Sequence, residues 1–188
     1  MNRKRATKKN LIAYHEAGHA VAAYLTRKKF KYVTIKSNKD YEGYMRHEEQ
    51  RATSRPEWDE RRKTRSSIEK DIMVSLAGSA AIFLLTGHRE RIGAWADRRR
   101  AMDLAENICD SRRECEAFVN WLYVRVEGIL RSQANWHAVE TLAEELMILG
   151  SIGYQKAVHI IRAAKRQFRR RRWKDIPRQV LMFPVMGR

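Results

Sequence analysis

Residues 15–19 have the sequence HEAGH, which places two histidines and a glutamate on little more than one turn of a predicted helix. Side chains four residues apart on an α-helix lie about 40° apart around the axis, so His15 and His19 can reach the same metal ion. Zinc binds imidazole nitrogen at about 2.0–2.1 Å. Glu16 lies about 100° around the helix, where its carboxylate can take a proton from a metal-bound water. The spacing predicts a zinc site that activates water.

An HExxH motif is weak evidence by itself, because it arises by chance in on the order of 1% of chains of this length and composition. Its neighbours here are small or apolar, namely Ala13, Ala17, Ala20, Val21 and Tyr24. Such neighbours are typical of a packed helix, where histidines and acids need a polar partner. The setting favours a metal ion over a purely structural role for the histidines.

A catalytic zinc site has three protein ligands, and the identity of the third decides the subclass. The extended metzincin pattern requires glycine at position 22 and histidine at position 25, whereas this chain has Ala22 and Leu25. That class is therefore excluded. The remaining candidates for the third ligand are His88, Glu90, Asp97, Glu106 and His137.

Helical phase favours Asp97 among these candidates. In a helix that begins near residue 94, Asp97 lies on the same apolar face as Ala101 and Leu104. Arg98 and Glu106 lie about 100° or more away from that face. A carboxylate directed at a core is costly unless it is paired or binds a metal. The alternative role is an N-cap, since Asp often begins a helix.

The elements that hold these residues begin with a helix. Asn10 is the expected N-cap, and the helix is expected to run to about Leu25. Alternating apolar and polar residues predict a strand at 30–37, and a second strand at 41–45 would complete a hairpin. Residues 46–65 have almost no apolar content and are expected to form an exposed loop.

The rest of the chain is expected to be helical. Ser66 and Glu69 form a capping-box pattern that opens a second helix, which continues through an apolar stretch at 72–85. Apolar periodicity predicts further helices at 94–110, 113–131, 136–149 and 152–172. The sequence thus predicts an α+β fold that is mostly α-helical, with a small hairpin beside the first helix.

Positive charge is concentrated at the two ends of the chain. The 188 residues include 39 Lys and Arg against 22 Asp and Glu, a net charge of +17. Most of this excess lies in residues 1–9 and 162–188, whereas residues 10–161 are nearly neutral. We therefore expect a domain at 10–165 between basic tails at 1–9 and 166–188.

The C-terminal tail interleaves arginine with Phe168 and Trp173, as segments that bind nucleic acid or another anionic partner do. The candidate contacts are Arg166, Arg169, Arg170, Arg171, Arg172 and Lys174. A solvated helix end or a disordered tail is the competing interpretation.

No segment has the pattern of a signal peptide or a membrane span. The polar residues of the motif interrupt the apolar run at 11–25, and the stretch at 72–85 is too short to cross a bilayer. Cys109 and Cys115 cannot form a disulfide framework, and on one helix they would face different ways. We expect a cytoplasmic protein.

The motifs together resemble one protease family. Residues 13–21 resemble the zinc helix of the FtsH family, the ATP-dependent, membrane-anchored AAA zinc proteases. Residues 32–35 resemble a strand that follows that helix, and residues 72–81 resemble the family's buried second helix. The segment GAWAD at 93–97 resembles the GAxxD helix, whose aspartate is the third zinc ligand. The resemblance extends over about residues 11–165.

This resemblance implies a zinc metalloendopeptidase with an FtsH-like peptidase fold, in which the small hairpin packs on the zinc helix. His15, His19 and Asp97 would bind one Zn²⁺ per chain, and Glu16 would act as the general base. The implied substrate is a peptide or an unfolded protein, and family members suggest a hexamer. An extended substrate could pair with an edge of the strand at 31–37, unless that strand only packs on the helices.

The chain also departs from the family. It has no P-loop pattern and no predicted membrane span, so substrate threading would need a separate AAA partner. Ile82 and Phe83 stand where the family usually has acidic residues, which bears on hexamer contacts. Two other functions stay open: a catalytically idle zinc-bound binding or regulatory module, and a basic nucleic-acid-associated protein. The intact Glu16 favours the enzyme over the idle module.

Overall fold

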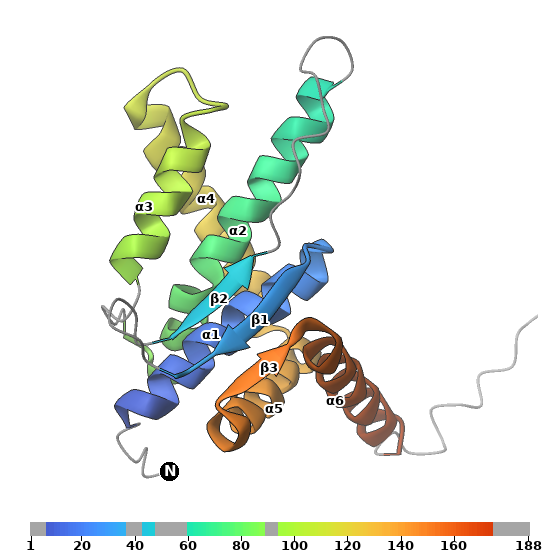
Figure 1. Ribbon diagram of the computed structural model, residues 1–188. Helices are drawn as coiled ribbons and strands as arrows, with labels where there is room; N and C mark the ends of the chain where they lie inside the picture. The colour runs from blue at the N-terminus through green and yellow to red at the C-terminus, as the bar shows by residue number, and fades with distance from the viewer. Residues whose placement is uncertain (1–6, 37–42, 48–59, 89–93, 175–188) are drawn as a thin grey trace, which may run out of the picture.

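The computed structural model describes residues 7–36, 43–47, 60–88 and 94–174, and these form a mostly helical α+β fold (Figure 1). The elements are α1 (Lys8–Thr26), β1 (Phe30–Thr34), β2 (Tyr44–His47), α2 (Glu60–Thr86), α3 (Ala94–Ala105), α4 (Arg112–Arg131), α5 (Gln133–Leu149), β3 (Ser151–Gly153) and α6 (Tyr154–Lys174). The predicted fold class is confirmed. Among the described helices, none combines the length and apolar character needed to cross a bilayer.

The sheet has three antiparallel strands in the order β2-β1-β3, not the two that the sequence predicted. Val33 at its centre pairs with Met45 on one side and Ile152 on the other. Because both sides of β1 are paired, the prediction that this strand offers an edge to a substrate is wrong. The unpaired edges of the described sheet belong to β2 and β3.

Helix α1 is the centre of the fold. Figure 1 shows it crossing behind β1 and β2, and it packs against both α2 and α5. Ala13, Ala17 and Ala20 are fully buried, and these small side chains let neighbouring helices come close. Gly18 lies against α2, since an added Cβ would be only 2.6 Å from the carbonyl oxygen of Ala77. Helices α4, α5 and α6 contribute further buried apolar residues to the same core.

The first helix begins earlier than predicted. Thr7 is the N-cap, and its hydroxyl accepts a hydrogen bond from the amide of Asn10 at 3.3 Å. Asn10 therefore lies inside the helix. Threonine and asparagine are both good caps, so the sequence alone does not distinguish them.

Helix α2 also begins earlier, at Glu60, and the predicted capping box at Ser66 lies inside it. The charged turns before the apolar stretch are helical, and Arg65 forms an ion pair with Glu69 at 3.6 Å. The predicted loop at 46–65 is wrong for residues 46 and 47, which belong to β2, and for its last six residues, which belong to α2, while residues 48–59 lie outside the described part.

The two cysteines lie on different elements. Helix α3 ends at Ala105, so Cys109 follows it, whereas Cys115 lies in the first turn of α4. Burial, together with the neighbouring Cys115 thiol, raises the pKa of the Cys109 thiol to about 11, so the two side chains lie close together. The expectation that they face apart was wrong, because it assumed one continuous helix.

Candidate metal centre

Two helices bring three potential metal ligands together. His15 and His19 come from the middle of α1, and Asp97 comes from the first turn of α3. The Nε2 atoms of the histidines are 3.0 Å apart. The Oδ2 atom of Asp97 lies 3.0 Å from Nε2 of His15 and 3.2 Å from Nε2 of His19. The three atoms thus form a nearly equilateral triangle.

The triangle matches the size of a zinc site. Donor atoms at 2.0–2.1 Å from a tetrahedral zinc ion lie about 3.3 Å from one another, close to the three observed separations. The Nδ1–H group of His19 donates a hydrogen bond to the backbone carbonyl of Val74 at 2.7 Å. In the neutral ring this leaves the Nε2 lone pair directed at the centre of the triangle. The donor set therefore fits Zn²⁺, because three lone-pair atoms this close together need a cation between them.

The electrostatics also favour a cation. Burial disfavours ionisation of Asp97, yet the neighbouring imidazoles of His19 and His15 together outweigh it and hold the pKa of this carboxyl below its usual range. Burial likewise disfavours the charged form of His19, but the Asp97 carboxylate raises the pKa of this imidazole to about 9. Burial lowers the pKa of His15. The site thus attracts positive charge through Asp97.

Glu16 lies beside this triangle and is only 3% exposed. Burial raises its pKa to about 7, although His19 opposes the rise. Its Oε2 atom has no hydrogen-bond partner among the described residues. On its other side, Oε1 lies 3.3 Å from the position that a Cβ on Gly43 would take. A buried carboxyl with a pKa near neutrality can both accept and return a proton.

The other candidates for a third ligand are not part of this group. His88 and Glu106 are exposed, and Glu90 lies outside the described residues. His137 lies on α5, 3.9 Å from Glu140. Only Asp97 of the five predicted candidates joins the two histidines in the described part of the chain.

Trp95 does not pack in the core. Its side chain is 72% exposed, and the guanidinium of Arg99 lies 5.4 Å from its ring centroid. The ring is on the outer surface of α3, although it lies only two residues before Asp97.

The basic residues predicted to contact an anionic partner lie at the end of α6. Arg166 is exposed. The side chains of Arg169, Arg170, Arg171, Arg172 and Lys174 lie outside the described part, so this prediction stays open.

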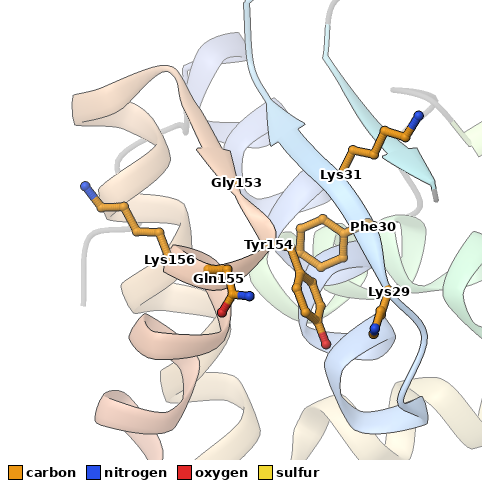
Figure 2. Close-up of a pocket in the computed structure, with 7 residues that line it drawn as sticks. All are labelled: Lys29, Phe30, Lys31, Gly153, Tyr154, Gln155 and Lys156. Atoms are coloured by element: carbon orange, nitrogen blue, oxygen red, sulfur yellow. The ribbon is translucent and has the colours of Figure 1, made fainter.

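A separate cavity of about 610 Å³ lies between the start of β1, the end of β3 and the first turn of α6. Figure 2 shows the rings of Phe30 and Tyr154 at its middle, with the side chains of Lys31 and Lys156 extending apart at its rim. It contains none of the residues that form the triangle, and we assign it no chemistry.

Sequence reasoning missed Val74, Gly43 and Gly78, which border the site. Val74 contributes only its backbone carbonyl, and the two glycines contribute only the space left by a missing side chain. None of the three can therefore be identified from the chemistry of its side chain. The run of small residues at 77–81 was the available signal that α2 approaches another element closely.

Comparison with known families gives a match over the N-terminal part of the chain. The family model for peptidase family M41 matches residues 3–112, which extend from before α1 to the first residue of α4. This range includes the HExxH segment and Asp97. No curated protein matches the chain.

Proposed function

The chain belongs to peptidase family M41, the FtsH zinc peptidase family, and from this premise we propose that it hydrolyses peptide bonds in unfolded or flexible proteins. In this proposal His15, His19 and Asp97 hold one zinc ion, and Glu16 is the general base. The observation that supports it most directly is the triangle of donor atoms, with sides of 3.0–3.2 Å, beside a buried carboxyl.

When bound, zinc would polarise the scissile carbonyl and lower the pKa of a coordinated water toward neutrality. Glu16 takes the proton of the attacking water and returns it to the leaving amine. A pKa of about 7 suits both transfers, because the group then accepts and releases a proton at similar cost. Val74 keeps the His19 ring in the orientation that presents Nε2 to the metal.

We propose that the substrate lies along β2 in an extended conformation. This strand has an unpaired edge in the described sheet, and it begins next to Gly43. A Cβ on Gly43 would lie 3.3 Å from Oε1 of Glu16, which supports a substrate position beside the proposed general base. Backbone pairing with an edge strand would hold a peptide regardless of its side chains, as an enzyme acting on unfolded chains requires.

The domain division and the partners are proposals too. We place the peptidase domain at 10–165 and basic tails at 1–9 and 166–188, with an anionic partner for the tails. An unfoldase of the AAA class would supply substrate, and the chain would assemble with further copies of itself. Size-exclusion chromatography with light scattering tests the assembly.

The decisive experiment compares Glu16→Gln with the wild-type chain in casein cleavage and zinc content. We expect Glu16→Gln to retain zinc and to lose cleavage, and His15→Ala to lose zinc as well. Glu106→Gln is the matched control, because Glu106 is an exposed acid just after α3. It should change neither the zinc content nor the rate of casein cleavage. Cleavage by Glu16→Gln at the wild-type rate would refute the proposal. Zinc binding by a wild-type chain that does not cleave casein would instead favour the idle module.

A further inference from the structure

Gly78 of α2 faces both histidines of the HExxH motif. A Cβ atom at this position would lie 2.5 Å from Nε2 of His19, 2.6 Å from Cε1 of His15 and 2.7 Å from Nδ1 of His15. All three nearest atoms therefore belong to the imidazoles. Gly78 is a helical residue without a positive φ, so backbone conformation does not require glycine here.

We propose that Gly78 is a positioning residue of the metal site, because the space left by its missing side chain is where both imidazoles must stand to bring their Nε2 atoms together. This inference rests on the proposed zinc function.

The imidazoles cannot easily yield to a larger residue. Ordinary contacts of a Cβ begin at 3.4 Å, so a methyl group at Gly78 would have to displace the rings by nearly 1 Å. The His19 ring is held by its 2.7 Å hydrogen bond to the carbonyl of Val74, which lies on α2 one turn before Gly78. The His15 ring is confined against it, with the two ring centroids 4.6 Å apart in an edge-to-face arrangement.

Separation of α1 from α2 would not relieve the contact without a loss of packing. Gly18 on α1 lies so close to α2 that its own added Cβ would be 2.6 Å from the Ala77 carbonyl oxygen and 2.7 Å from the Cβ of Ala81. The nearest atoms to Gly18 are thus backbone and methyl groups of the neighbouring helix. The two glycines differ in this respect: Gly18 allows the helices to touch, whereas Gly78 leaves room for the ligands.

The test measures metal binding by Gly78→Ala independently of catalysis. Zinc affinity is measured by competition with a chromophoric chelator, and ligand geometry by the visible absorption of Co²⁺ bound in place of zinc. Displacement of metal-supporting groups typically weakens affinity 10- to 100-fold, so we expect the zinc dissociation constant to rise about 10- to 100-fold with an altered Co²⁺ spectrum. Far-UV circular dichroism confirms that the variant is folded.

Gly128→Ala is the matched control, because Gly128 is also helical and an added Cβ there meets nothing within 4 Å. It should leave zinc affinity and the Co²⁺ spectrum unchanged. A folded Gly78→Ala with a dissociation constant within twofold of wild type and an unchanged spectrum would overturn the inference while leaving the proposed function intact. A wild-type chain that binds neither metal would overturn both.

If Gly78→Ala does not fold, the triple variant His15→Ala/His19→Ala/Gly78→Ala decides the matter. Removing both imidazole rings eliminates all three close contacts, so we expect folding to return. A triple variant that is still unfolded, beside a folded His15→Ala/His19→Ala control, would show that Gly78 serves helix packing, and the inference would be wrong.

Discussion

Zinc is expected to stabilise the fold, and Asp97→Asn is expected to remove most of that stabilisation. The proposed ligands come from α1 and α3, which are separated by most of the first half of the chain, so the unfolded chain has no assembled site. A ligand that binds only the folded state stabilises it by about 2.7 kcal/mol when its free concentration is 100 times the dissociation constant. For a chain of 188 residues this corresponds to an increase in Tm of about 5–11 °C.

The Asp97→Asn change keeps the shape of the side chain but removes the only carboxylate in the triangle. If the dissociation constant rises about 100-fold, the same zinc concentration contributes only about 0.4 kcal/mol, and the increase in Tm falls to about 1–2 °C. The assay is differential scanning fluorimetry with and without zinc, after treatment with a chelator. Asp103→Asn, an exposed acid on the same helix, is the control and should respond to zinc as the wild type does. An equal zinc response in Asp97→Asn would refute the assignment of Asp97 as a ligand.

Two further predictions concern the scaffold around the site. The ammonium group of Lys28 is nearly buried and lies 2.8 Å from both Asp71 and Ser67. Asp71→Ala should therefore lower the free energy of unfolding, measured with urea, by about 2 kcal/mol. This value lies between those typical of surface ion pairs and of fully buried ion pairs. Lys28→Met should lower the free energy of unfolding clearly less, because it leaves no buried charge without a partner. An equal loss in the two variants would contradict this explanation. Leu142 is fully buried in the core, so Leu142→Ala should cost about 2–5 kcal/mol, against less than about 0.5 kcal/mol for the exposed Val124→Ala.

The pairing of His15 with His19 and the inward direction of Asp97 could be predicted from the geometry of single helices, whereas the grouping of all three was implied by the resemblance to the FtsH family. The four-residue spacing fixes the angle between the histidines, and the phase of Asp97 within its own helix directs it inward. The structure brings these three side chains together, as the sequence predicted. Their roles as ligands, and that of Glu16 as base, await the experiments above.

Features that depend on contact between elements could not be predicted in the same way. Strand β3 has three residues, too few for an alternating pattern, and it is a strand because it pairs with β1. The amide of Ile35 extends this pairing by donating to the carbonyl of Gly150 at 2.9 Å. The acceptor for His19 is likewise a backbone carbonyl, whose position depends on how α2 packs and not on the identity of Val74.

The distribution of unsatisfied polar atoms distinguishes the site from the rest of the interior. Buried polar groups in folded proteins nearly always have hydrogen-bond partners, because desolvation without one is costly. Among the described residues, four buried side-chain atoms lack a partner: His15 Nδ1, Glu16 Oε2, Ser75 Oγ and Asp97 Oδ2. Three of the four belong to the proposed centre. Asp97 Oδ2 has two nitrogens within 3.2 Å, but in the neutral rings that bind a metal through Nε2 these nitrogens present lone pairs, which do not make a hydrogen bond with the carboxylate. A sequence selected for stability alone would have little reason to keep this cost in one place, whereas a cation beside Asp97 Oδ2 and a water beside Glu16 Oε2 would offset it at two of these atoms.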